Sequence, residues 1–489
     1  MTQVWIWLAI LAFALAGAVV AMAAARTNTG TATDYYLGNR GLGGMVAGLS
    51  YASTTYSAFM LIVLTGLTYR GGVGALGFEL IYFSGLTLLV VFGPRFWLAS
   101  RRWGFITPSE MLGARYGDRN VARLVAVISL IFLLPYSTTQ MAGIGLLLSG
   151  VTGDQIGLGT SIAIGAVLAI AWTLVAGLRS VAWTDAGQAV VMVISSLLAV
   201  GFVVAAIGGP DAFVSEMIQT RGAWLDVPGP GLWSLPTFLA LALPWFFFPL
   251  SNPQVSQRLF AVRDIGSMRR MIAWVLGFGL IFTLIAVIWG FSALILVPDL
   301  EATATATPAL LISGAIPAWI AVLLVVGILS AAISTLDSIA LTLGSMVARD
   351  LGRGRRGEDA AQIFAGRLTV VAVLLLASLF AYSQARIVEQ LAALSAAGLV
   401  VTVPAIIGAF FWRRGTAAGV LASLLGGGLT AVWMAMFAGV SVFDPLLPGT
   451  VLTVTTGLFV AVSLVTRPRE AALDFAGELR PELRARGIW

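Results

Sequence analysis

The chain alternates long apolar stretches with short loops that hold most of its arginines. About 13 apolar windows reach the roughly 20 residues that a helix needs to cross a bilayer. They centre near Ala12, Ser57, Ser84, Leu133, Ile164, Ser195, Phe246, Leu280, Ile328, Leu374, Leu399, Leu425 and Gly457. Because a spanning segment must satisfy its backbone polar groups internally, the pattern predicts an all-α polytopic membrane protein.

Two of these windows cannot form ordinary spanning helices. Residues 48–57 carry a run of hydroxyl side chains, and residues 243–254 contain three prolines, Pro244, Pro249 and Pro253. Proline removes a backbone donor and clashes with the preceding helical turn. Carbonyls freed in this way are tolerated at bilayer depth only where they are buried in protein or line a cavity. A matched pair of broken helices is typical of the binding site of a secondary transporter.

The two broken spans also indicate internal symmetry. Each opens a unit of about five spans, which predicts a 5+5 inverted repeat with its sites near the bilayer midplane. The predicted segments are 1–42 (an extra N-terminal helix and a cytoplasmic loop), 43–207 (the first repeat), 208–233 (an extracellular loop), 234–412 (the second repeat) and 413–489 (two extra helices and a cytoplasmic tail).

The arginines orient the chain in the membrane. There is no lysine, so all 28 basic residues are arginine. If the N-terminus lies outside, only Arg70, Arg221 and Arg386 fall on the outer side. Since arginine-rich loops stay cytoplasmic, we expect an inner-membrane protein with its N-terminus outside and its C-terminus in the cytoplasm. The net charge of +6 then reflects topology, and no nucleic-acid partner is expected.

Composition narrows the chemistry further. The chain is 59% hydrophobic and 10% charged, whereas a soluble domain has about 25% charged residues. It has no cysteine and no histidine, which excludes thiolate and imidazole ligands, disulfides and the commonest general base. Without lysine there is no Schiff base either. We therefore expect no enzyme activity.

Carboxylates inside apolar spans are costly, so each is a candidate functional residue. Three stand out: Glu79, Asp185 and Asp337. Glu79 could pair with Arg70 or contact a solute. Asp185 could cap a helix, pair with Arg179 or belong to a cation site.

Asp337 lies within a segment whose helix face bears hydroxyl groups. Helical spacing places Ala331, Ser334, Thr335 and Ser338 on one side. A hard cation such as Na+ takes oxygen ligands, and the broken span near Ser57 offers loose carbonyls. The alternative is that these hydroxyls bond to their own helix or pack against another. The nearby break and aspartate favour ion ligands.

Several short motifs occur together in one order. They are Asp34-Tyr35-Tyr36-Leu37-Gly38-Asn39-Arg40, Thr107-Pro108-Ser109-Glu110-Met111-Leu112, Trp183-Thr184-Asp185 with Gln188, Gln257-Arg258, and the run 330–338. In these segments the chain resembles the sodium:solute symporter family, which has a leucine-transporter-type core. The resemblance covers nearly the whole chain.

The resemblance implies a Na+ site between the first and eighth core helices. Ser53, Tyr56 and Ala331 would supply carbonyls, and Ser334 and Thr335 would supply hydroxyls. Some relatives bind a second Na+, and the matching positions here are Ser334, Asp337, Ser338 and Asp185. Asp337 stands where some relatives have serine, so its carboxylate would strengthen that site or replace the ion by internal charge.

The resemblance and the broken spans together also imply a solute site. The predicted contacts are Thr54, Thr55, Ser57, Glu79, Gln140, Trp245 and Phe248. Trp245 matches an aromatic contact position, Gln140 resembles the monocarboxylate and pantothenate branches, and Thr55 stands where proline carriers have aspartate. No mid-membrane arginine is expected.

The predicted function is Na+-coupled symport of a small monocarboxylate or neutral amino acid by alternating access. The alternatives are a membrane sensor module of the same fold, and an uncoupled uniporter or channel.

Overall fold

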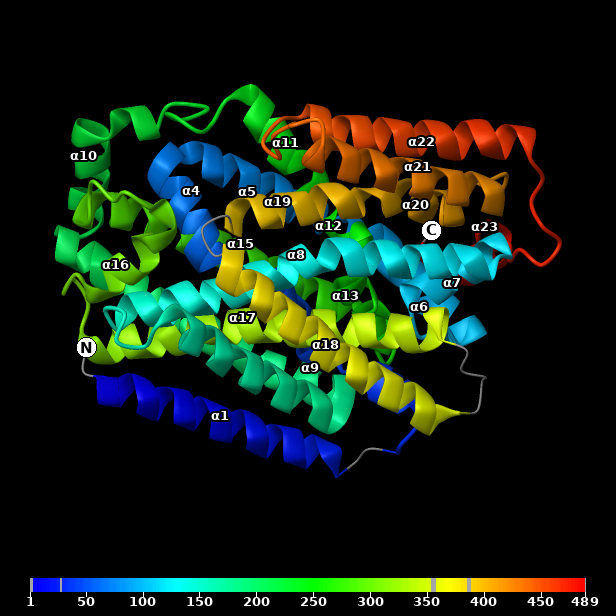
Figure 1. Cartoon of the computed structure of the whole chain (residues 1–489), viewed down its shortest axis with the longest axis horizontal. Helices are drawn as coiled ribbons and strands as arrows, with labels where there is room; N and C mark the ends of the chain where they lie inside the picture. Colours follow the sequence, from blue (N-terminus) through cyan, green and yellow to red (C-terminus); the bar gives the residue numbers. More distant parts are fainter. Residues whose placement is uncertain (1–2, 27–28, 353–357, 385–387, 489) are drawn as a thin grey trace.

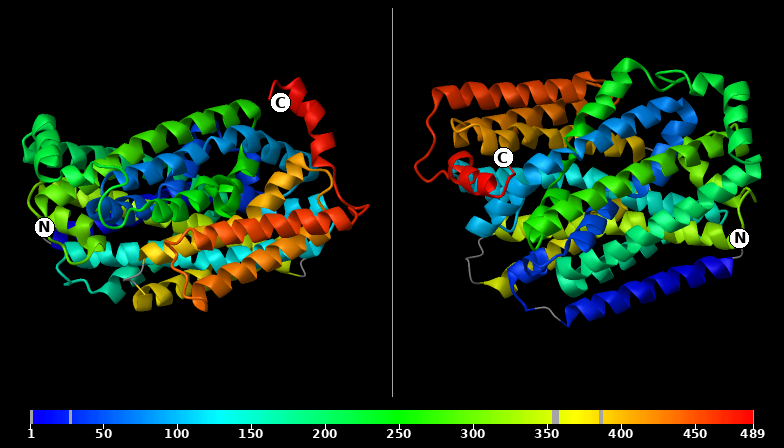
Figure 2. Two further views of the ribbon diagram at one scale, coloured as in Figure 1. Left: turned by 90° about the horizontal axis from the view of Figure 1, so that it is seen from above. Right: turned by 180° about the vertical axis from the view of Figure 1, so that it is seen from behind.

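The structure is a computed structural model that describes residues 3–26, 29–352, 358–384 and 388–488. The described residues form helices and turns, with one isolated bridge between Leu42 and Val262 and no named strand. The long helices run along one common direction, with α1 (Gln3–Ala25) at one edge and α22 (Leu446–Val465) at the other (Figures 1 and 2). The predicted all-α membrane protein is confirmed.

The helices that build the rest of the bundle fall into two sets along the chain. The first set is α2 (Ala32–Leu37), α3 (Gly44–Thr55), α4 (Leu64–Gly71), α5 (Val73–Gly85), α6 (Leu88–Trp103), α7 (Pro108–Tyr116), α8 (Arg119–Val151), α9 (Leu158–Ile207) and α10 (Pro210–Thr220). The second set is α11 (Leu235–Phe246), α12 (Phe248–Ser251), α13 (Pro253–Ser256), α14 (Arg258–Ala261), α15 (Ile265–Leu296), α16 (Ala306–Ile312), α17 (Ala318–Met346), α18 (Asp359–Gln384), α19 (Val388–Leu399), α20 (Val403–Phe411), α21 (Ala417–Met436), α23 (Phe475–Glu478) and α24 (Arg480–Ala485).

Fewer helices meet the length and composition required of a membrane span than the sequence suggested. Ten helices among the described residues are long and apolar enough to cross a membrane, or up to 11 if the bent pair α3 and α4 is one span. The remaining predicted spans coincide with the shorter apolar helix Leu158–Leu174 and with the interrupted series α11–α14. The count of about 13 and the inverted repeat stay predictions, as do the five predicted segment boundaries.

The first predicted break forms at the end of the hydroxyl-rich run. Helix α3 stops at Thr55, and Tyr56 leaves helical geometry at φ −95° and ψ 79°. A π-helical turn (η2, Phe59–Val63) then leads into α4. The two helical parts are bent by 43°.

The second predicted break follows the prolines. Phe247 separates α11 from α12, and Asn252, which has extended backbone at φ −97° and ψ 107°, separates α12 from α13. Pro249 and Pro253 lie in the first turns of the short helices that follow, where a missing N–H costs nothing.

Helix α9 contains the turn between the two predicted spans near Ile164 and Ser195, and this turn lies at Gly177. Gly177 has φ 63° and ψ −153°, a region open essentially to glycine alone. A Cβ atom there would lie 2.2 Å from the carbonyl oxygen of Tyr35. The glycine therefore lets α2 approach the turn between the two parts of α9.

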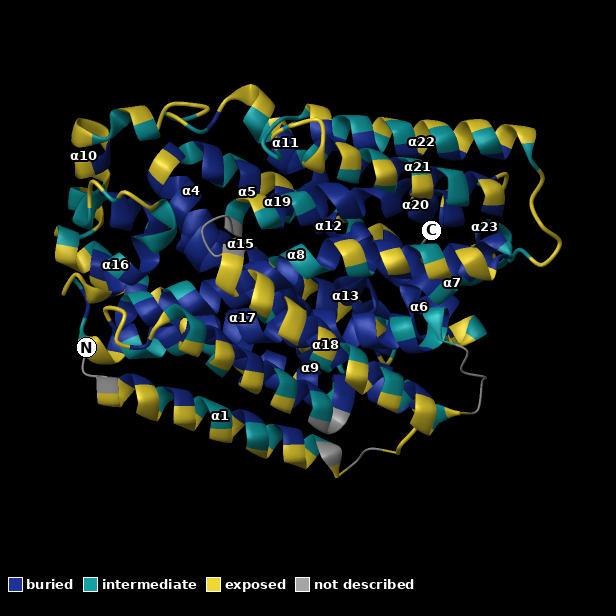
Figure 3. Ribbon diagram, in the orientation of Figure 1, coloured by how far each residue is buried: buried dark blue, intermediate teal, exposed yellow. Residues whose placement is uncertain are grey.

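Helix α17 forms the centre of the bundle. It packs against α3, α8, α9 and α18 and is buried along most of its length, whereas α1, α21 and α22 expose one face (Figure 3). The N-terminus lies at one end of the bundle and α23 at the opposite end (Figure 1). The centre is where α17 meets the broken helix α3.

Candidate ion and solute site

The break in α3 releases a row of carbonyl groups. The regular helical pattern ends where the Tyr56 amide donates to the carbonyl of Ala52. The next carbonyls along the chain, those of Ser53, Thr54 and Thr55, accept hydrogen bonds from side chains of other helices. A backbone carbonyl buried without a partner is costly, and these side chains satisfy the groups that the break leaves over.

Hydroxyl groups of α17 meet two of these carbonyls. Ser334 Oγ donates to the Ser53 carbonyl at 3.1 Å, and Thr335 Oγ1 donates to the Thr54 carbonyl at 3.2 Å. Both hydroxyls also lie near the Ala331 carbonyl, at 3.2 and 3.0 Å. All five residues are buried. The result is a compact cluster of carbonyl and hydroxyl oxygens between two helices, the kind of donor set that a hard cation takes.

Four of the five predicted Na+ ligands therefore lie together: Ser53, Ala331, Ser334 and Thr335. Tyr56 lies at the break itself, where its ring packs on Tyr82, Phe278 and Phe282. The carbonyl of Thr54 joins the cluster, although Thr54 was predicted as a solute contact.

The candidate second ion site contains an arginine. Arg258 on α14 donates through Nη2 to Asp185 Oδ2 at 2.7 Å and also to Ser338 Oγ. Its Nε donates to Ser50 Oγ at 3.0 Å, and Ser50 Oγ donates to the same carboxylate oxygen at 2.8 Å. Arg258 is only 2% exposed and Asp185 is fully buried. This network links α3, α9, α14 and α17 next to the predicted Na+ site.

Three sequence-based interpretations are wrong at this point. Arg258 was placed in a cytoplasmic loop, but the break after α13 turns it into the bundle. Asp185 is no helix cap, because it lies well inside α9. It does not pair with Arg179, which instead binds Asp34 at 2.8 Å.

Asp337 lies one residue before Ser338 and is fully buried. Its Oδ1 accepts a hydrogen bond from Thr173 Oγ1 at 2.8 Å. Its Oδ2 and the Oδ1 of Asp185 have no hydrogen-bond partner among the described residues. The carboxyl groups of Asp185 and Asp337 thus lie near the single arginine Arg258, and each has one oxygen without a hydrogen bond among the described residues.

The solute candidates gather on the other side of the break. Ser57 lies between α3 and η2, where its hydroxyl is 3.2 Å from the hydroxyl of Tyr136 and accepts from Gln140 Nε2 at 3.2 Å. The Oε1 atom of Gln140 has no hydrogen-bond partner in the described part of the chain. Ser57 and Gln140 are therefore brought together as predicted contacts, with an unused acceptor.

Aromatic rings line the same region. Trp245 and Phe248 stack with centroids 5.5 Å apart and ring planes within 3°. Tyr82 meets both rings edge-on, at 5.2 and 5.3 Å, and Tyr136 does so at 6.2 and 6.4 Å. Phe59 covers Trp245 at 4.9 Å. The second broken helix thus contributes an aromatic wall opposite the first break.

Glu79 on α5 is fully buried, and neither carboxyl oxygen has a hydrogen-bond partner within the described residues. Its neighbours on α5, Phe78 and Tyr82, both contact the Trp245 ring, at 6.0 and 5.2 Å between centroids. The predicted pairing with Arg70 is wrong, because Arg70 lies 3.6 Å from Glu389. Glu79 is a buried acidic group beside the aromatic wall without a protein cation.

The side chains of Thr54 and Thr55 turn back to their own helix. Thr54 Oγ1 donates to the Ser50 carbonyl at 2.9 Å, and Thr55 Oγ1 donates to the Tyr51 carbonyl at 2.7 Å. Both hydroxyls thus bond to the preceding turn, and Thr54 Oγ1 also lies 2.9 Å from Ser338 Oγ on α17. In this conformation neither is oriented toward Gln140.

Sequence reasoning missed Tyr82, Tyr136 and Arg258. Tyr82 is three residues from Glu79, and Tyr136 is four residues from Gln140, so each shares a helix face with a residue that was named. That spacing could have identified both tyrosines. Arg258 was named as part of the motif Gln257-Arg258, and its position five residues after Pro253 in a broken span could have indicated its burial.

The fold has two broken helices, and the freed carbonyls of one of them face a hydroxyl-bearing helix. A buried cluster of aromatic rings and one acidic group lies beside them. This arrangement defines the class of secondary transporters. A sequence model of the sodium:solute symporter family matches residues 35–427. The chain belongs to this family, as the motifs suggested.

Relatives and solved structures agree with this assignment. The chain is 26% identical over 459 residues to the high-affinity proline transporter PutP of Bacillus subtilis, covering 90% of this chain and 94% of the relative. It is 25% identical over 441 residues to the sodium/pantothenate symporter of Escherichia coli, with 86% and 88% covered. A structure of a Na+-coupled sialic acid symporter, in a substrate-bound outward-open state, superposes with a TM-score of 0.80 at 18% identity, covering 96% of this chain and 99% of that one.

The chain is accordingly a multi-pass membrane protein that couples the movement of a small solute to Na+. Family members of this kind are transporters rather than enzymes. Na+ coupling, predicted from the residues and the resemblance, is confirmed at the level of the family.

Proposed function

We propose that the protein is an inner-membrane symporter that carries a small neutral amino acid together with Na+. The observation that carries this proposal is Glu79, a buried carboxyl group next to an aromatic wall that has no hydrogen-bond partner among the residues the structure describes. A buried charge needs a partner, and the ammonium group of an amino acid supplies one.

Of the two solute classes, the amino acid is better supported. The relatives in the comparison include a proline transporter and a pantothenate symporter, so names alone leave both classes open. A monocarboxylate without an amine would bring a second negative charge near Glu79, and like charges in a low-dielectric site repel strongly. An amino acid can place its ammonium near Glu79 and its carboxylate toward Ser57 and Gln140 Nε2.

For Na+, we propose the oxygen cluster between α3 and α17. Ser53 and Ala331 contribute carbonyls, and Ser334 and Thr335 contribute hydroxyls. Tyr56 remains a proposed fifth ligand through its carbonyl. Unwound backbone that faces a hydroxyl-bearing helix is how transporters of this architecture hold a cation.

A second cation site is a further proposal. Asp185 and Asp337 each keep one carboxyl oxygen without a hydrogen bond, and Ser338 adds a hydroxyl. Arg258 provides one positive charge for the two acidic groups. A second Na+ at the unsatisfied oxygens would balance the remaining charge. We also propose that the N-terminus lies outside, which places the arginine-rich loops in the cytoplasm.

The test combines ligand screening with transport. Thermal unfolding of the purified protein is followed with each neutral amino acid and with acetate, lactate and pyruvate, in NaCl or in choline chloride. Stabilisation by an amino acid only in NaCl supports the proposal. The radiolabelled amino acid is then offered to proteoliposomes with and without an inward Na+ gradient. Equal uptake with and without the Na+ gradient would establish a uniporter or channel. Stabilisation by the monocarboxylates alone would refute the amino acid as the solute class.

A further inference from the structure

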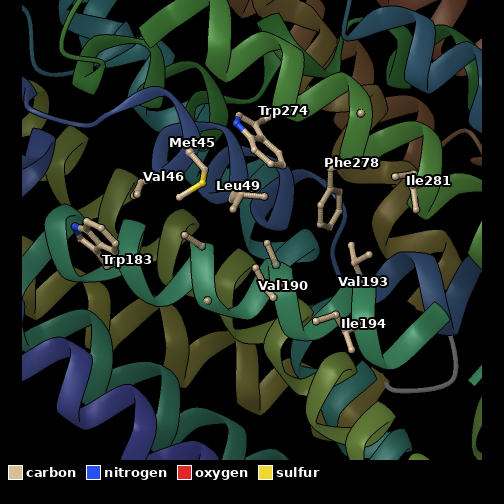
Figure 4. Close-up of a pocket in the computed structure, with 14 residues that line it drawn as sticks. Met45, Val46, Leu49, Trp183, Val190, Val193, Ile194, Trp274, Phe278 and Ile281 are labelled. Atoms are coloured by element: carbon tan, nitrogen blue, oxygen red, sulfur yellow. The ribbon is translucent and has the colours of Figure 1, made fainter. Parts of the chain in front are cut away.

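A deep apolar groove opens on the side of the bundle between α3, α9 and α15 (Figure 4). Its volume is about 580 Å³, within the range of about 300–1,000 Å³ of ligand pockets. None of its 14 lining residues has a charged, hydroxyl or amide side chain. The wall includes Met45, Leu49, Trp183, Val190, Trp274 and Phe278.

The groove faces outward from the bundle. Trp183, Ile194 and Trp274 line it and are 53%, 50% and 45% exposed. All three helices belong to membrane spans, so these side chains meet lipid rather than water. An apolar cavity that opens to lipid suits a hydrocarbon chain and not the small polar solute of the central site.

Positive charge lies at one end of the groove. Arg270 is one helical turn before Trp274 and extends the stripe of Trp274, Phe278 and Ile281 along α15. Arg269 is next to it, both are exposed, and neither forms an ion pair within the described residues. Asp264, the acidic residue that caps α15, is bound by Arg263 at 2.9 Å.

The helix ends add to this positive potential. Helices α3 and α15 both begin at this end of the groove, and the N-terminus of a helix carries a partial positive charge. The N-cap of α3 is Gly43, which makes no side-chain hydrogen bond, so its first amides have no side-chain acceptor. Gly44 lies against Arg270. An anionic group can thus meet two arginines and a helix terminus at once.

We propose that this groove binds an anionic phospholipid, with one acyl chain in the groove and the phosphate at Arg269 and Arg270. Bound there, the chain contacts Leu49, one turn before Ser53, whose carbonyl belongs to the ion cluster. The lipid therefore packs on the half of the broken helix that holds the ion ligands. This groove is separate from the proposed solute site around Glu79, Gln140 and Trp245.

Glycines in the groove allow a direct test. A Cβ atom added at Gly187 or Gly277 would meet nothing within 4 Å, so Gly187→Leu and Gly277→Leu fill the groove without a backbone clash. The matched control is Gly201→Leu, which lies on α9 beyond the groove and also has open space. An Arg269→Gln/Arg270→Gln double variant removes the charge and leaves the groove open.

Each variant is purified as the full chain, incubated with equal amounts of phosphatidylglycerol and phosphatidylcholine, and examined by native mass spectrometry. We expect the wild type and Gly201→Leu to retain phosphatidylglycerol preferentially. The leucine variants should lose it, and the arginine variant should bind it more weakly by about fivefold for each arginine removed. Equal retention of the two lipids by the wild type would overturn the proposal, as would unchanged phosphatidylglycerol binding in the filled and uncharged variants. If a leucine variant does not yield folded protein, the arginine variant decides the outcome.

Discussion

Replacing Ser334 by alanine tests the ion site at the point where the two helices meet. The Ser334 hydroxyl donates to the carbonyls of Ser53 at 3.1 Å and Ala331 at 3.2 Å. In the proposed Na+ site the same oxygen would be a ligand, with its hydrogen turned away from the ion. Alanine therefore removes one ligand from the ion-bound state and one donor from the ion-free state.

The two losses act in opposite directions on ion affinity. An interaction with a charged group contributes about 1.5–3 kcal/mol, and since about 1.4 kcal/mol is a factor of ten, the lost ligand alone weakens binding by about 10–150-fold. The Ser53 carbonyl is left unsatisfied in the ion-free variant, which costs about 1–3 kcal/mol, and Na+ would relieve that cost. With that relief at about 1 kcal/mol, the net loss is about 0.5–2 kcal/mol, and we expect the Na+ half-saturation constant to rise by about 2–30-fold.

The assay is initial solute uptake in proteoliposomes as a function of Na+ concentration, at saturating solute. The matched control is Ser330→Ala, because Ser330 is also buried on α17 but donates only to its own helix, at 2.8 Å from the Val326 carbonyl. The control should change the half-saturation constant by less than about twofold. An unchanged constant in Ser334→Ala, with protein yield equal to the wild type, would refute the proposed site.

Three further changes test other parts of the molecule. Glu79→Gln should raise the half-saturation constant for an amino-acid solute about tenfold or more, through loss of a charged contact, while a titration with Na+ shows little change; an unaffected solute constant would exclude Glu79 from the site. Arg258→Met should lower the free energy of unfolding by about 3–5 kcal/mol, because it leaves a buried carboxylate without its partner. Adding Asp185→Asn should restore most of this stability in thermal unfolding. A double variant as unstable as the single one would contradict the ion-pair argument. Gly177→Ala should destabilise the protein by on the order of 1–3 kcal/mol because of the backbone conformation at this position. Gly201→Ala, where the added Cβ has open space, should not. Equal unfolding temperatures of the two variants would rule out the strain.

The fold could be predicted from the sequence where a local signal acts alone. The apolar windows predict spans because a bilayer requires a minimum length, and the prolines of the 243–254 segment predict breaks because each removes a donor. The windows near Ile164 and Ser195 predict a turn within α9, but no local signal places that turn at Gly177. Gly177 needs its special conformation only because Tyr35 approaches from another helix, and this contact cannot be read along the chain.

The grouping of candidate ligands could be predicted where they share one helix face, and it was missed where the residues come from different elements. Ser334 and Thr335 follow from helical spacing on α17. Arg258 was read as a loop residue, since a charge after an apolar window normally marks the membrane surface. Its burial depends on the acceptors that Asp185, Ser50 and Ser338 bring from three other helices. Sequence alone does not show that these partners exist.

The geometry of the break also accounts for how ion and solute can depend on each other. The carbonyls of Ser53 and Thr54 face the hydroxyls of α17, and Ser57, a few residues further on, faces Gln140 and Tyr136. These residues belong to one short segment, so a cation that draws the two carbonyls toward itself also restricts where Ser57 can lie. The solute then meets a hydroxyl that is already positioned and loses less conformational freedom on binding. Coupling between sites is typically about 1–3 kcal/mol, which is no more than the contribution of one or two such contacts. In the proposed sites, a direct link of three residues would therefore be sufficient to make Na+ favour solute binding.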